Sequence, residues 1–481
     1  MLQKLLSWIR KVANRLIPKQ NIAQALHVET EVSGRMAAAV DLWMRLYTGR
    51  PPWLWDEKGI RDENVQTLGL PASIATKVAK MVTLEMKTEI TGSARANYLA
   101  MQMQPVLDNI RRYTEYACAQ GGLVLKPYID GADIAVDLTQ ADCFYPTAFN
   151  SRGEVTGAVF AEQITRGNRY YTKLEHHDLQ DDGYHIVNRV FVSRDRDALG
   201  AEIPLQQIPE WADIEPEATI TGVTQPLFAY FRIPQANTID TNSPLGVSVY
   251  SRAVDLIREA DMQYSRILWE YEGSELAIDV DITTLQTGWD GTPTKLPKGK
   301  DRLYRGLNLS GGAKEDFYKP YAPAIRDASL YNGLNKQFQQ IERVCGLSFG
   351  TLSDPQSVDK TATEIKASKQ DMYTTITDIQ KGLRAALEQL LYAIDVWTTV
   401  GALAPRGAYE LTVQFDDSIL NDPDVQKQQD AQDVRDGLMA KWEYRAKWYG
   451  ESEDIAKARI SEIGKQEDTD PFGFNRQAGG G

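Results

Sequence analysis

The sequence predicts an α+β fold in which helices predominate. Long segments in both halves of the chain place apolar residues at helical spacing, whereas the stretch that begins at Gly121 alternates apolar and polar residues with the period of a β-strand. Hydrophobic residues make up 42% of the 481 residues, which is enough to form packed cores. The length indicates about three domains.

Residues 1–20 are expected to form an amphipathic, basic helix. Five lysines and arginines and no acidic residue accompany an apolar face made by Leu2, Leu5, Leu6, Ile9, Val12, Leu16 and Ile17. Such a helix suits docking on its own subunit or a neighbour, or else a membrane or nucleic-acid surface. It lacks the uninterrupted apolar core and the cleavage site of a signal peptide.

Helices and then strands are expected through residues 21–243. The helical segments are about 29–47, 70–87 and 94–119, the last of them kinked or divided at Pro105. A hairpin of strands 123–129 and 133–138 follows, because Asp130-Gly131 between them accepts the positive φ angles that hairpin turns require. Strands over 155–165, 169–175 and 184–193 continue it, so this region is α+β.

Two long helices then bracket a small insert. Ser243-Pro244 supplies a cap residue and a first-turn proline, so we expect a helix over 244–272. A strand over 277–282 begins an insert that spans 273–326. This insert carries a basic cluster, which fits docking to another macromolecule as well as it fits a solvated loop: Lys295, Lys298, Lys300, Arg302 and Arg305.

The chain from Asp327 to Val400 predicts a helix, a long polar loop and a longer helix. Apolar residues share one face over 327–345, after which two glycines and a proline break the pattern over 346–360. Thr361-x-x-Glu364 is a capping box for the longer helix. Loops of about 12–15 residues without secondary structure are uncommon in compact domains and are usually functional or disordered. Because strong helices hold both ends of this one, we interpret it as functional.

The C-terminal part is expected to hold a strand and further helices. The region 361–418 combines the long helix with a strand over 409–415. Helices over 422–450 and 451–465 fill most of a last region, 419–470. Residues 471–481 are expected to form a flexible tail.

Charge and cysteine content narrow the class of protein. The formal net charge is −13, and a protein that grips nucleic acid over its whole surface would be basic, so any DNA contact is local or weak. Three widely spaced cysteines exclude a disulfide framework and a Cys-rich zinc site. No apolar run approaches the roughly 20 residues needed to span a bilayer.

Catalytic motifs are missing from the sequence. It contains no phosphate-binding loop, no dinucleotide fingerprint, no paired histidines of a zinc protease and no nucleophile elbow. We therefore assign no catalytic residue, metal or cofactor. Two metal sites stay open as alternatives. His176 or His177 could act with His185, although neighbouring residues on a strand point to opposite faces. Asp416 and Asp417 could hold Mg²⁺, or they could simply cap turns after a strand.

Two segments of the chain resemble the portal proteins of tailed bacteriophages, which connect head to tail. One is Ser243-Pro-Leu-Gly-Val-Ser-Val-Tyr250-Ser-Arg-Ala-Val-Asp255, which is similar to the first stem helix of that family. The other is Leu334-Asn-Lys-Gln-Phe-x-x-Ile-Glu342-x-x-Cys345-Gly346-Leu-Ser-Phe-Gly350-Thr-Leu-Ser-Asp354-Pro355, which runs into Lys360-Thr-Ala-Thr-Glu364-Ile-Lys366. The resemblance is specific from about Ser243 to Asp417 and is weaker, though in the same order, elsewhere.

This resemblance implies a subunit with wing, stem, clip and crown regions. By analogy the wing is 21–243, the stem helices are 244–272 and 327–345, the clip is 273–326, the tunnel loop is 346–360 and the crown is 419–470. The long helix and strand of 361–418 return to the wing. These subunits would form a ring, a dodecamer, at one capsid vertex, through which a separate terminase drives double-stranded DNA.

The resemblance also implies site residues and partners. The residues expected to face the DNA channel are Ser353, Asp354, Gln356, Ser357, Lys360, Lys336 and Arg343. The basic cluster of the clip would meet the large terminase and later the head–tail adaptor, and the major capsid and scaffolding proteins are further partners. The subunit would occupy the host cytoplasm during assembly and the virion afterwards, and no membrane contact is expected.

The residues fit this interpretation independently. A DNA duct must not bind its cargo well, because each neutralised phosphate adds a sequence-independent trap, and an acidic chain with few basic positions meets that need. Without a nucleotide-binding loop the chain is not the motor. Apolar stripes on long helices suit burial between neighbouring subunits of a closed ring. The competing hypotheses are a metal-dependent nuclease that uses Asp416 and Asp417, and a membrane pore built on the N-terminal helix.

Overall fold

The structure, a computed structural model, describes residues 19–55, 59–281, 304–307, 318–354, 362–415 and 423–467. Two compact units divide the chain, Met1–Gln414 and Phe415–Gly481. Helices and strands alternate in blocks through the first unit, whereas the described part of the second is helical. The predicted α+β class is therefore confirmed. Within the described part of the chain, no helix is both long enough and apolar enough to cross a membrane.

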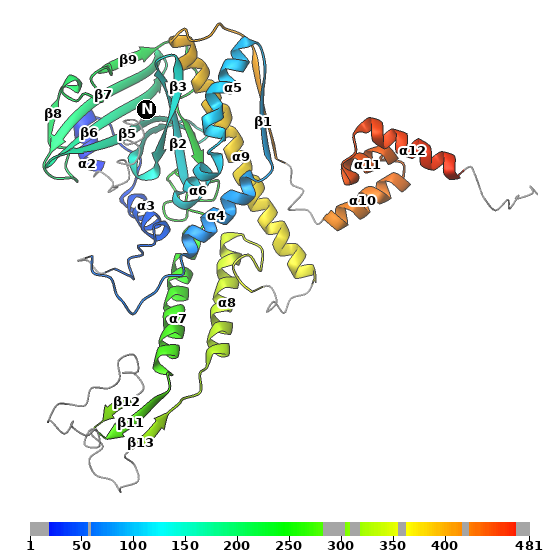
Figure 1. The fold of residues 1–481 in the computed structure, drawn as a ribbon. Coiled ribbons are helices and arrows are strands. Elements are labelled where there is room, and N and C mark those ends of the chain that lie inside the picture. The colour runs from blue at the N-terminus through cyan, green and yellow to red at the C-terminus, as the bar shows by residue number, and fades with distance from the viewer. Residues whose placement is uncertain are drawn as a thin grey trace, which may run out of the picture. The chain divides into compact units, whose positions relative to one another are not determined.

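Among the described residues, five helices precede the first large sheet (Figure 1). They are α2 (Lys19–Leu26), α3 (Gly34–Tyr47), α4 (Leu70–Thr83), α5 (Ala94–Leu107) and α6 (Ile110–Gln120). The predicted division near Pro105 is confirmed, since α5 ends two residues after this proline. The start at residue 29 was wrong: the Ser33 hydroxyl accepts a hydrogen bond from the Met36 N–H at 3.2 Å, so α3 begins at Gly34.

The end predicted for the helix over 70–87 was also wrong: α4 ends at Thr83. Residues Met86–Gly92 form strand β1, which pairs with β14 (Tyr409–Phe415) in a two-stranded sheet. This strand was missed because its partner lies more than 300 residues further along the chain. The strand predicted over 409–415 is confirmed.

Two antiparallel sheets form the centre of the first unit. The predicted hairpin is confirmed as β2 (Gly122–Asp130) and β3 (Asp133–Gln140), joined through Gly131 at φ +68°, and β10 (Ala229–Arg232) extends it. The predicted meander is confirmed in a larger sheet whose strands are β4 (Phe144–Phe149), β5 (Val155–Arg166), β6 (Arg169–Gln180), β7 (Gly183–Ser193), β8 (Ala201–Ile203) and β9 (Glu217–Ile220).

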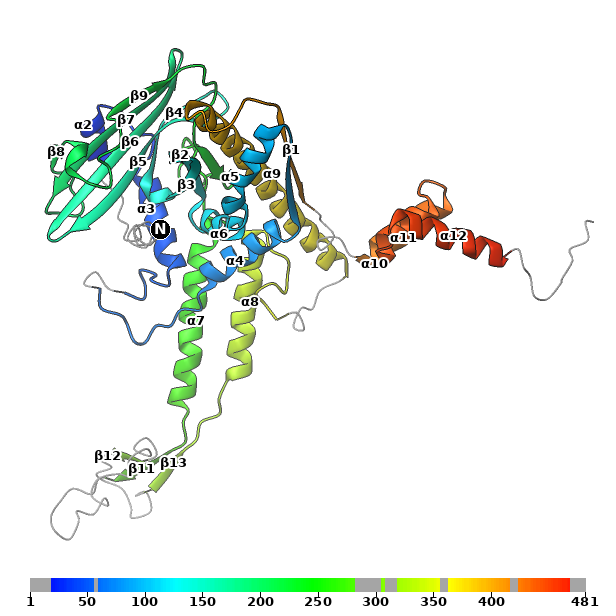
Figure 2. The same ribbon diagram turned by 45° about the horizontal axis from the view of Figure 1, so that its top comes forward.

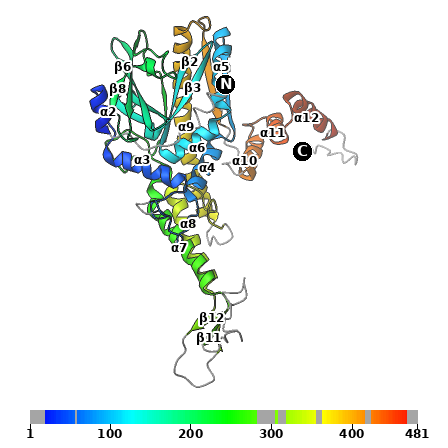
Figure 3. The same ribbon diagram turned by 60° about the vertical axis from the view of Figure 1, so that its left-hand side comes forward.

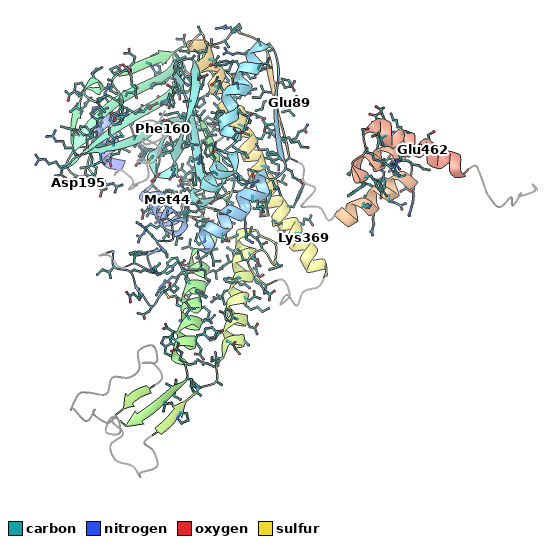
Figure 4. All side chains as sticks on the ribbon, in the orientation of Figure 1. Met44, Glu89, Phe160, Asp195, Lys369 and Glu462 are labelled. Atoms are coloured by element: carbon teal, nitrogen blue, oxygen red, sulfur yellow. The ribbon has the colours of Figure 1, made fainter. Side chains whose placement is uncertain are left out.

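An aromatic core holds these strands together. Phe160 of β5 has its ring centroid 5.7 Å from that of Phe144 and 5.3 Å from that of Phe228, and Figure 4 places Phe160 within the sheet region. The long helix α9 (Ala362–Val400) packs against β10 and β2 as well as against α4 and α5. Its residues Ile376, Leu383, Leu390 and Ile394 are fully buried, so this apolar face packs inside one subunit and not, as expected for the long helices, between neighbouring subunits.

The first stem helix begins later than Ser243-Pro244 predicts. Helix α7 spans Val254–Gly273, preceded by one 3₁₀ turn, Ser251–Ala253. The intervening backbone bonds to the rest of the unit instead: the Val249 N–H donates to the Cys118 carbonyl at 3.0 Å. A Cβ at Gly246 would lie 2.0 Å from the Gly121 carbonyl oxygen, so the two glycines let these segments touch.

Helices α7 and α8 (Asp327–Cys345) run side by side away from the sheets, and all three views agree on this (Figures 1, 2 and 3). The predicted bounds of α8 are confirmed. At their far ends lie three short strands, with β11 (Ala277–Asp281) between β12 (Tyr304–Leu307) and β13 (Tyr318–Tyr321). The strand predicted at 277–282 is thus confirmed.

The second unit contains three described helices. They are α10 (Pro423–Arg435), α11 (Lys441–Tyr449) and α12 (Glu453–Glu467), and the indole N–H of Trp448 donates to Asp430 at 2.7 Å between the first two. The single helix predicted over 422–450 was wrong, because Gly437 takes a φ of +75° and the Ala440 N–H is capped by Glu443. The helix predicted over 451–465 is confirmed. The basic helix at 1–18 and the tail at 471–481 lie outside the described residues.

Candidate functional site

Helix α8 ends in a tightly built junction. Gly346 takes a left-handed φ of +68° and its N–H points to the Arg343 carbonyl at 3.4 Å, while the Leu347 N–H donates to the Glu342 carbonyl at 2.8 Å. This pair of bonds is the Schellman arrangement, which satisfies the last carbonyls of a helix. A Cβ at Gly346 would lie 2.5 Å from the Thr375 hydroxyl of α9, so the junction needs glycine on both grounds.

A buried carboxylate then holds the chain against α8. The Glu342 side chain is 0% exposed, and its Oε1 accepts hydrogen bonds from the Leu352 N–H at 2.5 Å and the Ser353 N–H at 2.8 Å. Its Oε2 accepts the Ser353 hydroxyl at 2.8 Å. The segment 346–354 is therefore folded back on the helix that precedes it.

Further contacts complete this loop base, the name used here for residues 346–354. The Gly350 N–H donates to the Ser353 hydroxyl at 3.2 Å, and the Asp354 N–H donates to the Asn335 side chain of α8 at 2.8 Å. From α4, the Lys77 ammonium donates to the Thr351 carbonyl. The loop base is thus bonded to both α8 and α4.

A basic, exposed face runs along α8. Lys336 and Arg343 are both exposed and lie about two helical turns apart, so they share one side of the helix. The Lys336 ammonium lies 3.5 Å from the Gln339 side-chain oxygen. Arg343 stands in the last turn, where a cation is favoured by the helix dipole. Both side chains are accessible to a polyanion.

The remaining predicted channel residues fall in different settings. Ser353 is 4% exposed and its hydroxyl is engaged by Glu342, whereas Asp354 is exposed. Gln356, Ser357 and Lys360 lie outside the described residues, as does the capping residue Thr361. Helix α9 is described from Ala362 and carries exposed Lys369 near its start (Figure 4).

Of the five basic residues predicted to form a cluster in the insert, only Arg305 lies among the described residues. Arg305 lies in β12, in parallel register with Asp279 of β11. Lys295, Lys298, Lys300 and Arg302 lie outside the described residues. The stem beside the insert exposes large apolar side chains, namely Trp269, Leu276, Ile325 and Tyr331.

The histidines do not converge on a metal site. His177 is buried: its Nε2 donates to Glu175 at 2.6 Å and its Nδ1 accepts from the Tyr184 hydroxyl at 2.8 Å, and burial lowers the pKa of this imidazole. His185 instead bonds Asp182 at 2.8 Å. Across the described ranges, no three His, Cys, Asp or Glu side chains are grouped as metal ligands would be. Asp416 and Asp417 lie outside those ranges.

Glu175, the buried partner of His177, also forms ion pairs with two lysines. Lys126 lies 2.6 Å and Lys173 3.2 Å from Glu175. Burial alone would raise the pKa of Glu175, but the two ammonium groups hold it well below the usual range. The Glu175 carboxylate between two lysines ties β2 to β6.

Comparison with known families decides what kind of protein this is. The pattern of the family described as phage portal protein, SPP1 Gp6-like, matches residues 100–470, more than three quarters of the chain. The chain belongs to this family of phage portal proteins. No curated protein matches it. Portal proteins of this kind are structural components of a phage capsid vertex and form oligomeric rings with capsid and DNA. The predicted family resemblance is therefore confirmed.

Sequence reasoning missed the residues that build the loop base of this portal protein. The burial of Glu342 could have been predicted from its position. It lies four residues after Phe338 and three before Cys345, at the edge of the apolar face of the helix, where a buried charge needs hydrogen-bond partners. The role of Lys77 could not have been predicted, since this residue stands more than 270 residues before the carbonyl that it binds. The sequence also offered no sign that Ser353 is buried.

Proposed function

We propose that this portal protein forms a dodecameric ring through which double-stranded DNA is packaged into the capsid and later ejected. Membership of the portal family supports the ring and its place at the capsid vertex. The two-helix stem, which leaves the sheet region as a pair, suits the wall of such a ring, because its exposed face would meet neighbouring subunits.

Within that ring, the exposed face of α8 and the loop that starts at Gly346 would lie nearest the DNA. Lys336 and Arg343 offer two cationic positions on each subunit. The sequence places a third cation, Lys360, in the same loop. Repeated around a ring on an acidic protein, a few such charges give weak phosphate contacts that release easily. Asp354, Gln356 and Ser357 would line the same passage. Ser353 is better assigned to the loop base, because its hydroxyl already bonds Glu342.

The insert between the stem helices would be the clip that docks the large terminase and then the head–tail adaptor. Its basic cluster includes Arg305 on β12, and the exposed apolar side chains beside it offer contact area. The wing would meet the major capsid and scaffolding proteins. Assembly in the host cytoplasm would precede incorporation into the virion.

Electron microscopy of the purified protein tests the ring. Monodisperse particles with a central hole and twelve-fold averages are expected. A protein that stays monomeric at micromolar concentration would refute the conduit.

A deletion tests the role of the loop. Removing residues 355–359 spares Ser353 and its bond to Glu342, so the loop base should persist. We expect rings of normal size that package or retain less DNA when assembled into proheads with their terminase. Replacing the same five residues by a Gly-Ser segment of equal length separates loop length from side-chain identity. Normal packaging by both variants would remove the loop from the proposed function.

A further inference from the structure

The Glu342 carboxylate is fully buried. In the described part of the chain no lysine, arginine or histidine forms an ion pair with it, in contrast to the Glu175 carboxylate and its two lysines. Burying a charge is costly unless it is paired and hydrogen-bonded. Here the compensation comes from two backbone N–H groups and one hydroxyl, all of them in the loop base.

The choice of a carboxylate follows from the chemistry of these donors. Leu352 and Ser353 present backbone N–H groups and Ser353 adds an O–H, so only a group that accepts through two oxygens satisfies all three without rearrangement. The Ser353 hydroxyl in turn accepts from the Gly350 N–H, which links the turn at 350 to the same anchor. Bonds from neutral donors to a carboxylate are stronger than neutral pairs.

We propose that Glu342 is the positioning residue of the tunnel loop. Its carboxylate holds Leu352 and Ser353 against α8, and Lys77 of α4 holds Thr351 from the wing, so that Asp354 leaves the stem at a fixed point. Glu342 itself is 0% exposed, so its side chain would not reach DNA. It acts on DNA passage through the place from which the loop starts, and in this respect the inference rests on the proposed function.

Lys77 makes the anchor a link between two regions. Helix α4 packs against α6 and α9 of the wing, and its lysine reaches the loop base by one bond to a carbonyl. Glu342 binds the neighbouring residues of the same turn from the stem. The position of the loop base is thus set jointly by stem and wing, and neither helix alone defines it.

Amide hydrogen exchange on assembled rings tests the anchor directly. In Glu342→Ala the Leu352 and Ser353 amides lose their acceptor, and their exchange should accelerate about tenfold or more, whereas amides inside α9 should keep their rates. Glu342→Gln keeps one oxygen for both N–H groups, so it should rescue most of the protection. Glu388→Ala, a change of an exposed glutamate on α9, is the matched control. Wild-type exchange at Leu352 and Ser353 in Glu342→Ala would overturn the proposal.

A second variant covers the case in which Glu342→Ala fails to assemble. Ser353→Ala removes only the hydroxyl, so rings should form and the Gly350 and Ser353 amides should exchange faster. Unchanged rates at both amides would count against the anchor.

DNA packaging assays distinguish the positioning role of Glu342 from the proposed function of the loop. If Glu342→Ala rings assemble, exchange faster at the loop base and package less DNA, with recovery in Glu342→Gln, the positioning role holds. If exchange accelerates and packaging stays normal although deletion of 355–359 impairs it, the positioning role fails while the loop keeps its function. If neither change affects packaging, the proposed role of the loop fails first.

Discussion

The two ends of the helix pair α7 and α8, proposed above as the stem, are built on different principles. At the end next to the sheets, polar groups of both helices are buried and bonded to distant parts of the subunit: Glu342 to the loop base, and Asp261 of α7 to the Trp53 indole at 3.0 Å and the Leu68 N–H at 2.8 Å. At the end next to the insert, Arg326 forms a two-pronged bond to Glu270 at 2.8–3.0 Å, amid exposed Trp269 and Tyr331.

This difference indicates where the subunit is complete and where it needs partners. At the sheet end the buried carboxylates Glu342 and Asp261 find their hydrogen-bond partners within one chain, so this geometry is set inside the subunit. The insert end leaves large apolar side chains in water, as is typical of surfaces that bind other proteins. Mutations should therefore change the stability of the subunit at the first end and its assembly at the second.

The largest difference is expected between two apolar residues of α8. Ile341 is 0% exposed at the sheet end, so Ile341→Ala should lower the free energy of unfolding by about 2–5 kcal/mol through lost burial and a cavity. Tyr331 is 44% exposed near the insert, and Tyr331→Ala should change it by no more than about 0.5 kcal/mol. Urea unfolding of the two variants side by side measures this. Similar losses for both would contradict the comparison.

The junction at Gly346 should show the next largest effect. Gly346→Ala forces an alanine into the left-handed region, which costs about 1–2 kcal/mol, and brings its Cβ against the Thr375 hydroxyl. Adding Thr375→Ala should relieve the contact but not the backbone strain, so stability recovers only in part. Denaturant midpoints of the single and double variants separate the two causes. Full recovery would show that backbone conformation is not the constraint.

Ser353→Ala should cost about 1 kcal/mol, the usual net value of one buried hydrogen bond. Thr374→Ala serves as a control, because this exposed hydroxyl bonds only a carbonyl of its own helix. Thermal melting of both variants should rank Ser353→Ala as the less stable. An equal or smaller loss at Ser353 would argue against its place in the anchor.

The smallest effects are expected from pH, and they have opposite signs at the two ends. Burial raises the pKa of Asp261 above 3.8, so the folded state keeps a proton that the unfolded state has lost, and stability falls as pH rises from 3.8 through that raised pKa. Arg326 lowers the pKa of Glu270, so its contribution is present above 4.5 and is lost as pH falls below that value.

Melting temperatures between pH 3.5 and 7 check these signs. Asp261→Asn should remove a contribution that decreases with rising pH, and Glu270→Gln one that increases. Slopes of the same sign in both difference curves would contradict the assignment of burial at one end and ion pairing at the other.

Much of the architecture was accessible from local sequence patterns. The bounds of α8 were predicted because its apolar stripe and the following glycine act within a few residues of each other. The hairpin at Gly131 was predicted for the same reason, although Asp130 ends the strand, paired with Asp133, and only Gly131 takes a positive φ there. Strand β10, with four residues, is too short to show a period of two. Strand β1 has seven residues, but its start was included in the helix predicted over 70–87, and its partner β14 lies more than 300 residues further along the chain.

Residue types and their order are enough to predict the helical and strand periods, the acidic balance and the portal family, because each depends on composition, short spacing or fixed order. The start of α7 at Val254 and the bond between Ser353 and Glu342 become visible only in the folded chain. Both outcomes depend on hydrogen-bond partners from other parts of the fold, Cys118 for the backbone near Val249 and Glu342 for the loop base. Buried polar groups must find such partners, and no local pattern records where they will be.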